Sequence, residues 1–366
     1  MRILFCGGGT AGHVIPAIAM AEILLREKIA SEVAFVGRVS GNENRAIVKE
    51  GYKLYTIDVS GFKRSLSLKN INVVFKTIKS SRTAKEIIFD FSPDLVIGTG
   101  GYVCYPIIRA AQRLGIKNMM HESNIHPGLV TRLLGKKCDA LLLNSEGTRQ
   151  HLRKNENTVV IGNPLRVNFS SISKEEARRR LGIGKGTFLI LSFGGSLGAD
   201  VLNENIIQVM QDYSAVKKDV RHIHSSGVSR YSTMRDIAPQ LCSGTNGCKI
   251  VPYIDDMATY LNAADLIICR SGAMTISELS AVGKAAILIP SPNVAENHQY
   301  ENAKYVTDRG GAMMIEEKNL NCNALKAMID DLKEHPKTRA GFEEQIKKIS
   351  HADTPKLLIN AVKSIL

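Results

Sequence analysis

The sequence predicts an α/β protein of two domains, each with a parallel sheet covered by helices. The chain has 366 residues, which exceeds one typical domain and suits two of about 150–200 residues each. Short apolar strands alternate with helical patterns along its length, as is typical of parallel sheets. Two glycine-rich strand-to-helix turns, Gly7–His13 and Gly194–Ala199, each begin a series. These observations predict domains over 1–163 and 164–340, and a C-terminal helix in 341–366 that packs back on the first domain.

Composition and charge restrict the class of protein. The net charge of +13 favours an anionic partner: a nucleic acid, an anionic membrane face or a phosphorylated substrate. No nucleic-acid-binding motif accompanies this charge, so a nucleic-acid-binding protein is a weaker interpretation. The longest apolar runs have the length of strands, which argues against a transmembrane helix, and Met1–Cys6 lacks the layout of a signal peptide. Seven cysteines without C-x-x-C spacing predict free thiols in a reducing cytoplasm.

The first predicted domain consists of short strands followed by glycine-rich or polar turns. The first turn, Gly7–His13, fits the G-x-G-x-x-G pattern of dinucleotide sites, which need an acidic residue at the end of the second strand. That strand ends in Gly37 and Arg38, so an NADP-dependent oxidoreductase is only a weak alternative. The turns Thr99–Tyr102 and Glu122–Asn124 are expected to join the first turn along one sheet edge. The predicted strands are Arg2–Cys6, Glu32–Val36, Asp94–Gly98, Asn118–His121, Leu141–Leu143 and Val159–Ile161.

The second predicted domain follows a hinge at Gly162–Arg166 and ends with two neighbouring strand-to-helix turns. Within Cys269–Ala303, a small-residue turn leads into a helix that carries Glu278, and the next helix begins with several amides. Backbone N–H groups at helix N-termini suit phosphate, and a lone carboxylate suits the hydroxyls of ribose. These turns predict a nucleotide-sugar site in one of two Rossmann-like domains that face each other across a cleft. The predicted strands are Phe188–Phe193, Val220–His224, Lys249–Val251, Leu266–Cys269 and Ala285–Ile289.

The segment Gly61–Lys85 combines basic and apolar residues. It holds seven lysines and arginines, no acidic residue, and apolar residues that fall partly at helical spacing. An amphipathic helix with a solvated basic face explains this pattern slightly better than a segment that rests on anionic lipid, although both remain open from the residues alone.

Eight motifs occur in one order along nearly the whole chain: GGGTAGHVIPA, GTGGY, HESN, GNPLR, GGSLGA, YIDDM, RSGAMTISEL and HQYENA. In this set the sequence resembles the MurG family of bacterial transferases. The resemblance implies the GT-B fold and an inverting transfer of N-acetylglucosamine from UDP-N-acetylglucosamine to the muramoyl C4 hydroxyl of lipid I, giving lipid II for peptidoglycan synthesis. It also implies a peripheral protein at the cytoplasmic face of the inner membrane. No D-x-D motif occurs, so no donor-bound metal and no tightly bound cofactor are expected.

The resemblance also implies roles for individual residues. Ile254 would pair with uracil, and Glu278 would bind the ribose hydroxyls. The full set expected to contact the UDP-sugar is Thr10, Ala11, Gly12, Asn124, Arg166, Gly195, Ser196, Ile254, Ala273, Glu278, His298, Gln299 and Asn302. Tyr102 and His121 would lie on the acceptor side. The membrane-associating patch would consist of Phe62, Lys63, Arg64, Leu66, Lys69 and Phe75, which reverses the preference for the solvated-face interpretation.

Two questions stay open from the sequence. His13 is the candidate general base because an unperturbed imidazole titrates near the operating pH, but it is equally suited to anchor the acceptor diphosphate. Glu122 is a weaker alternative base. The leading alternative to the transferase is an enzyme of the UDP-N-acetylglucosamine 2-epimerase type, which shares the fold.

Overall fold

The computed structural model describes residues 1–39, 41, 44–59, 69–153, 156–195, 198–216, 219–244, 247–351 and 353–366, without the side chains of 11, 69–79, 170 and 216. It divides into two compact units, Met1–Arg166 with His351–Leu366, and Val167–Ser350. The sequence placed these divisions at 163/164 and 340/341. The second division lies later because helix α14 (Pro336–Lys347) packs within the second unit, and only α15 (Thr354–Ser364) belongs to the first.

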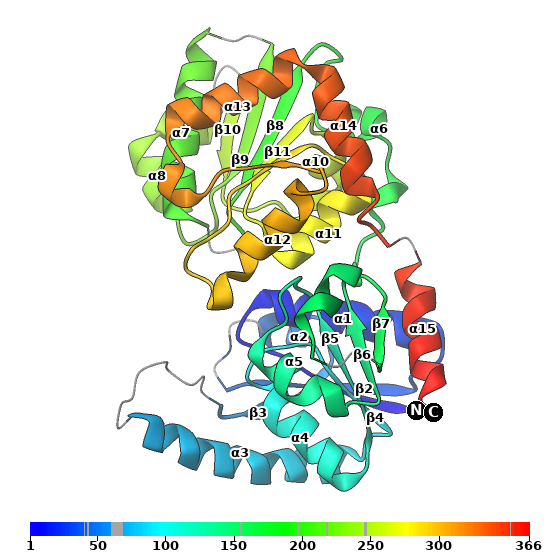
Figure 1. The fold of residues 1–366 in the computed structure, drawn as a ribbon. Helices are drawn as coiled ribbons and strands as arrows, with labels where there is room; N and C mark the ends of the chain where they lie inside the picture. Colours follow the sequence, from blue (N-terminus) through cyan, green and yellow to red (C-terminus); the bar gives the residue numbers. More distant parts are fainter. Residues whose placement is uncertain are drawn as a thin grey trace. The chain divides into compact units, whose positions relative to one another are not determined.

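The described part of the first unit contains a seven-stranded parallel sheet with the order β3-β2-β1-β4-β5-β6-β7 (Figure 1). Its strands are β1 (Arg2–Cys6), β2 (Glu32–Arg38), β3 (Lys53–Ile57), β4 (Leu95–Gly98), β5 (Lys117–Glu122), β6 (Ala140–Leu143) and β7 (Thr158–Val160). Its helices are α1 (Ala11–Arg26), α2 (Asn44–Lys49), α3 (Lys69–Phe91), α4 (Cys104–Leu114), α5 (Leu129–Leu134) and α15, with short 3₁₀ turns at η1 (Gly135–Lys137) and η2 (Glu146–His151).

Strand β1 shows why this sheet is buried on both faces. Successive side chains of a strand point to opposite faces, so Leu4 and Cys6 enter one apolar cluster with helices α3 and α4. Ile3 and Phe5 enter a second cluster with α1, where Leu358 and Val362 of α15 also pack. The C-terminal helix therefore completes the core of the first unit.

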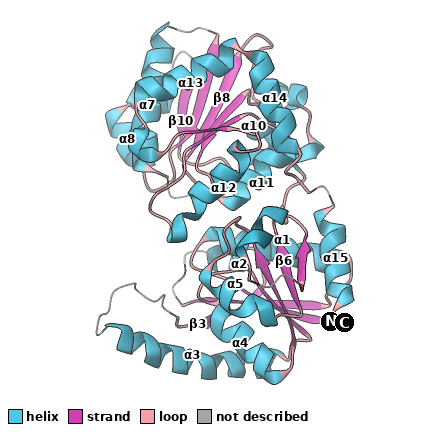
Figure 2. Ribbon diagram, viewed as in Figure 1, coloured by secondary structure: helices cyan, strands magenta, loops and turns pink. Residues whose placement is uncertain are grey.

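The described part of the second unit contains a six-stranded parallel sheet with the order β10-β9-β8-β11-β12-β13 (Figure 2). Its strands are β8 (Phe188–Phe193), β9 (Val220–Ser225), β10 (Cys248–Val251), β11 (Leu266–Cys269), β12 (Ala286–Leu288) and β13 (Met313–Met314). Its helices are α6 (Lys174–Arg180), α7 (Asp200–Val216), α8 (Tyr231–Ile237), α9 (Pro239–Ser243), α10 (Met257–Ala263), α11 (Ala273–Val282), α12 (His298–Thr307), α13 (Cys322–Glu334) and α14, with 3₁₀ turns at η3 (Phe169–Ser171), η4 (Ala295–Asn297) and η5 (Glu317–Asn319).

The prediction of two parallel α/β units is confirmed, and two edge strands were missed. In both sheets the order reverses beside the first strand, between β1 and β4 and between β8 and β11. Strands β3 and β13 were not predicted, because half-buried edge strands lack the continuous apolar run of central ones. Among the described residues, no helix is long and apolar enough to cross a membrane.

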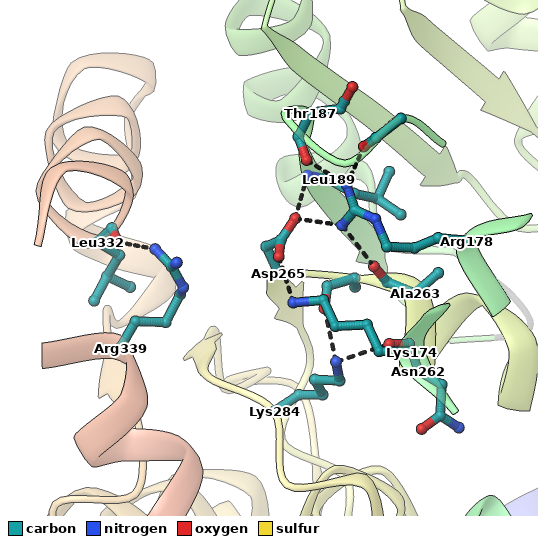
Figure 3. Close-up of polar contacts among 12 residues, drawn as sticks. Lys174, Arg178, Thr187, Leu189, Asn262, Ala263, Asp265, Lys284, Leu332 and Arg339 are labelled. Atoms are coloured by element: carbon teal, nitrogen blue, oxygen red, sulfur yellow. Dashed lines mark hydrogen bonds and ion pairs between the residues drawn. The ribbon is translucent and has the colours of Figure 1, made fainter. Parts of the chain in front are cut away.

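A buried ionic cluster joins α6 to the sheet of the second unit (Figure 3). The carboxylate of Asp265 accepts bonds from Arg178 Nη1 at 2.9 Å, Lys174 Nζ at 2.6 Å and the Leu189 N–H at 2.8 Å. Burial alone would raise the pKa of Asp265, but these three donors outweigh burial and lower it. Arg178 also donates to backbone carbonyls, including those of Gly184 at 2.7 Å and Ala263 at 3.3 Å. The cluster therefore connects α6 to the loop before β8, to β8 itself and to the end of α10.

Replacing Arg178 with Met should lower the free energy of unfolding by about 3–5 kcal/mol, because it leaves Asp265 buried with one cation fewer and frees several carbonyls. Urea unfolding monitored by circular dichroism measures this change. The matched control is Arg179→Met, since the neighbouring Arg179 side chain is 76% exposed and lies outside the cluster. Equal midpoints for the two variants would contradict the structural role assigned to Arg178.

Candidate functional site

The loops at the carboxyl ends of the strands carry most of the residues singled out from the sequence. In open α/β sheets, ligands bind outside the carboxyl ends of the strands where the strand order reverses. In the first unit the loops after β1 and β4 meet at this point, since Gly8 N–H donates to Gly100 O at 3.4 Å. In the second unit the corresponding loops follow β8 and β11.

The half-buried imidazole of His13 is held between these two loops of the first unit. Its Nδ1 lies 3.0 Å from the carbonyl oxygen of Gly8 and 3.4 Å from Thr10 Oγ1. A Cβ at position 100 would lie 2.7 Å from His13 Cδ2, and one at 101 would lie 2.0 Å from Gly8 O. Only glycine fits at Gly100 and Gly101, which also have φ of +110° and +80°.

The bond to Gly8 decides the tautomer of His13. A carbonyl oxygen only accepts, so Nδ1 is the nitrogen that carries the proton. In the neutral ring, Nε2 then holds the lone pair. This is the arrangement that a general base requires, because the ring nitrogen that holds the lone pair is the one that can accept a proton.

Thr99 is a functional candidate that was not singled out as a site residue. Its buried hydroxyl donates to the carbonyl oxygen of His13 at 2.7 Å. A Cβ at Gly7 would lie 2.3 Å from this hydroxyl oxygen, so the glycine at the end of β1 makes room for the contact. The thiol of Cys104 also lies 3.1 Å from both N and O of Gly100. These contacts hold the loop around His13 in place. The residues that make them are close only in the folded structure, so the sequence does not identify them.

The structure gives Glu122 the role of an anchor. Its Oε1 accepts from the backbone N–H and side-chain amide of Asn124 at 3.0 and 3.2 Å. Its Oε2 accepts from Gly128 N–H at 2.9 Å and from Thr131 Oγ1 at 2.7 Å. The residue is buried, and all four contacts shape the turn after β5 and the start of α5. This geometry favours positioning of Asn124 over proton transfer to a ligand.

His121 and Tyr102 occupy opposite environments. His121 is fully buried in β5, where Nε2 donates to Gly162 O at 3.1 Å and Nδ1 lies 3.4 Å from Ser123 Oγ. Burial lowers its pKa, an effect that the bond to Gly162 partly offsets. Tyr102 is 44% exposed in the loop after β4. Tyr102 is therefore accessible to a ligand, whereas His121 supports the loops from within the sheet.

Arg166 is the last residue of the first segment of the first unit, and it is paired within that unit. Its guanidinium lies 2.7 Å from Glu22 and 2.9 Å from Glu50. Any contact with a diphosphate would therefore compete with two carboxylates. This pairing could not be predicted from the sequence, because Glu22 and Glu50 lie far from Arg166 along the chain.

In the second unit, the glycine-rich turn after β8 packs closely on the loop after β9. Gly195 and Gly198 have φ of +91° and +79°, and Gly198 N–H donates to Gly195 O at 3.0 Å. A Cβ at position 198 would lie 2.1 Å from the carbonyl oxygen of Ser226. Ile254 lies in the loop between β10 and α10, and its backbone forms no hydrogen bond with any described residue. Its amide and carbonyl therefore suit the hydrogen-bonding edge of a base.

Helix α11 begins at Ala273 and carries Glu278 in its second turn, as predicted. Its N-cap is Gly272, and no side chain caps the helix, which suits an anion at its N-terminus. The half-buried Glu278 carboxylate has no hydrogen bond or ion pair to the described part of the chain. Burial raises its pKa to about 7. A carboxylate kept from water without a protein partner is a candidate for contact with ligand hydroxyls.

The start of α12 is tied to the turn after β11. The buried Ser271 hydroxyl donates to Gln299 O at 2.8 Å, and Asn302 Nδ2 donates to Ser271 O at 3.3 Å. Gln299 Oε1 accepts from Ser291 N–H at 2.9 Å. His298 Nδ1 donates to Ala295 O at 2.8 Å. These contacts tie the turn before α11 to the start of α12, and they show that the amides of Gln299 and Asn302 partly serve the protein itself.

Several residues that were predicted to belong to the site or to the membrane patch lie outside the residues that the structure describes. Ser196, Phe62, Lys63, Arg64 and Leu66 fall on positions that the structure does not describe. Lys69 and Phe75 lie on α3, and Ala11 begins α1, but their side chains are not described either; Thr10 and Gly12 beside it are exposed. Among the described residues, no group of three or more His, Cys, Asp or Glu side chains could hold a metal ion.

Comparisons with known proteins agree along the whole chain. Family models for the N-terminal and C-terminal domains of glycosyltransferase family 28 match residues 3–143 and 189–357. The chain is 36% identical over 366 residues, covering 100% of both proteins, to the UDP-N-acetylglucosamine–N-acetylmuramyl-(pentapeptide) pyrophosphoryl-undecaprenol N-acetylglucosamine transferase of Thermoanaerobacter sp. (strain X514).

Solved structures agree with this similarity. Acinetobacter baumannii MurG has a TM-score of 0.79 at 25% identity, covering 99% of both chains. The UDP-GlcNAc 2-epimerase of Neisseria meningitidis has a TM-score of 0.66 at 13% identity, covering 100% of both chains, which shows a shared fold alone. The two matched domains and the full-length similarity show that this chain belongs to glycosyltransferase family 28.

Proposed function

We propose that this chain transfers N-acetylglucosamine from UDP-N-acetylglucosamine to the muramoyl C4 hydroxyl of lipid I, giving lipid II. The observation that carries the proposal is full-length similarity to a protein that is named as an N-acetylglucosamine transferase acting on a muramyl-(pentapeptide) pyrophosphoryl-undecaprenol. The uncapped start of α11 and the unpartnered Glu278 supply the chemistry that a nucleoside diphosphate needs. An enzyme of the 2-epimerase type remains the alternative, supported only by the shared fold.

Turnover of UDP-N-acetylglucosamine with and without a short-chain analogue of lipid I separates these functions. The transferase releases UDP only when the analogue is present and converts it to a disaccharide-linked product. An epimerase consumes the sugar nucleotide without the analogue and changes the configuration at C2 of the sugar. Turnover that is independent of the acceptor would overturn the proposal.

The proposed reaction is a single displacement at the anomeric carbon. The C4 hydroxyl oxygen of the acceptor forms the new bond, the bond from the anomeric carbon to the β-phosphate oxygen breaks, and UDP leaves with inversion from α to β. The hydroxyl proton passes to Nε2 of His13, which the bond from Nδ1 to Gly8 leaves as the basic nitrogen. Backbone N–H groups at the start of α11 would stabilise the charge that develops on UDP, without a donor-bound metal.

The resemblance to the family implies the remaining roles. Ile254 would pair with uracil through its backbone, Glu278 would bind the ribose, and Gln299 and Asn302 would contact the sugar. Arg166 would reach the diphosphate only by leaving Glu22 and Glu50. Lipid I is membrane-bound, so the enzyme would act as a peripheral protein at the anionic cytoplasmic face of the inner membrane, through the basic segment that includes Lys63, Arg64 and Lys69.

Replacing Glu278 with Gln should remove a pH dependence of donor binding. With a pKa of about 7, the unmodified carboxyl must lose a proton to accept from ribose, so affinity for UDP-N-acetylglucosamine should fall about tenfold from pH 8 to pH 6. Calorimetry should show a flat profile for Glu278→Gln, with weaker binding at pH 8. The diphosphate diester of this substrate carries no group that titrates in this range.

The same substitution should stabilise the protein without ligand. Because the pKa of Glu278 in the folded chain lies above the ordinary value near 4.3, folding stability decreases as pH rises from about 4.5 to 7. The variant lacks this loss and should melt at a higher temperature than the unmodified protein at pH 8. A lower melting temperature with an unchanged affinity profile would remove Glu278 from the site.

Replacing His13 with Ala should lower kcat by about 10²–10⁴-fold, because the variant lacks a positioned base. Affinity for UDP-N-acetylglucosamine should stay nearly constant, which calorimetry checks independently. If kcat is maintained and only the KM for the lipid I analogue rises, His13 anchors the acceptor diphosphate and another group accepts the proton.

Changing Lys63, Arg64 and Lys69 together to Glu should weaken sedimentation with anionic vesicles, since each basic residue contributes up to about 1 kcal/mol near an anionic surface. Salt should weaken binding of the unmodified protein in the same way. The matched control changes the exposed Lys185, Lys337 and Lys363 to Glu, with the same loss of charge. Equal binding by both triple variants would contradict a local membrane patch.

A further inference from the structure

A buried hydrogen-bonded chain runs beneath the glycine-rich turn of the second unit. It begins at His222 and His224, which both contact Ser192 Oγ at 2.8 Å, through Nε2 and Nδ1 respectively. His224 Nε2 lies 3.0 Å from Asn203 Oδ1, and Asn203 Nδ2 donates to the carbonyl oxygen of Ser226 at 3.0 Å. All five residues are fully buried, with 0% exposure.

The donor and the acceptor of every hydrogen bond in this series can be assigned by starting from its last acceptor, the Ser226 carbonyl oxygen. The Ser226 carbonyl can only accept, so the Asn203 amide nitrogen faces it and Oδ1 faces His224. His224 must then carry its proton on Nε2, and its Nδ1 accepts from the Ser192 hydroxyl. That hydroxyl oxygen in turn accepts from Nε2–H of His222.

Both imidazoles are neutral at ordinary pH, as this direction requires. Burial lowers the pKa of His222 to about 3 and that of His224 to about 4. His222 Nδ1 then carries a lone pair, and it is buried without a partner among the described residues. A buried acceptor without a donor lowers the free energy of unfolding. Stability alone therefore does not explain why this core contains the hydrogen-bonded chain.

The chain of hydrogen-bonded side chains ends at the contact that shapes the glycine-rich turn. Gly198 packs against the same Ser226 carbonyl, since a Cβ at position 198 would lie 2.1 Å from that oxygen. Gly195 and Gly198 both have positive φ, a conformation that glycine adopts but does not itself enforce. Asn203 is also in the first turn of α7, where its N–H donates to Ala199 O at 2.8 Å.

We propose that Asn203 and His224 are positioning residues that hold the Ser226 carbonyl, and through it the backbone of Gly195 and Gly198, in the arrangement that receives the diphosphate of the UDP-sugar. This inference rests on the proposed function. It assigns a role in donor affinity to side chains that touch neither the sugar nucleotide nor the acceptor. The polar chain is retained in an otherwise apolar core because it sets the position of one carbonyl.

The decisive variant is Asn203→Asp, which keeps the acceptor for His224 but places an oxygen against the Ser226 carbonyl. The dissociation constant for UDP-N-acetylglucosamine should rise at least about tenfold, while the KM for the lipid I analogue stays constant. Asn205→Asp is the charge-matched control, since Asn205 lies on the same helix and its Nδ2 donates to Val201 O at 2.8 Å, outside this hydrogen-bonded chain. Leu202→Ala is the stability control, because Leu202 is buried beside Asn203 in the apolar cluster. Both controls should bind the sugar nucleotide as the unmodified protein does.

A second pair of variants decides the question if Asn203→Asp does not fold. His224→Gln retains an N–H that can reach Asn203, whereas His224→Leu does not, so the Gln variant should bind UDP-N-acetylglucosamine more tightly. Equal affinity of this pair would overturn the inference. So would unchanged affinity of a folded Asn203→Asp variant, or equal weakening by Leu202→Ala. Absence of binding by the unmodified protein would refute the proposed function, and this inference with it.

Discussion

The parallel pairing of the first strand of each sheet with a strand far along the chain is the constraint on which the site depends. β1 pairs with β4, and the pairing continues past the strands, since Thr99 N–H donates to Cys6 O at 2.9 Å. Because parallel strands end at the same edge, this pairing brings the loop of Gly7–His13 against Gly100 and Gly101. β8 and β11 repeat the arrangement in the second unit. The apolar interior of each sheet therefore determines where the polar loops meet.

Close backbone approach at these edges explains the glycines better than loop flexibility does. Gly7 makes room for the Thr99 hydroxyl, Gly101 lies against the carbonyl of Gly8, and Gly198 lies against that of Ser226. Each glycine allows one loop to rest on another without an intervening side chain. The loops are consequently held by contacts within the protein, such as those of Thr99, Cys104 and Glu122. In this family member, these buried polar side chains support the backbone of the loops at the sheet edge.

The second unit contains buried polar groups of two kinds, those that are paired within the protein and those that are not. The cluster around Asp265 is fully paired, with its charges balanced by Arg178 and Lys174. Glu278 and His222 instead leave a carboxylate and a ring nitrogen without partners among the described residues. Lys284 is intermediate: burial, with the nearby Lys174, lowers its pKa to about 8, but it donates to the carbonyls of Asn262 and Ala264. An unpaired buried polar group is costly for folding, and such groups are typical of functional sites.

The two α/β units, most central strands and the loops that carry the candidate residues could be predicted from the sequence. Apolar runs bounded by glycine and polar turns are local features, so they can be read from the residues in order. The sequence did not determine the environment of any single side chain. The tertiary structure shows that buried hydrogen bonds within the protein hold the side chains of Glu122 and His121. It also shows that Arg166 is paired with Glu22 and Glu50, and that Glu278 has no partner among the described residues. It also revealed the chain from His222 to Ser226, because its members come from three elements. Hydrogen bonding depends on distance and direction between residues far apart in sequence, and the packing of helices on the sheet is what sets both.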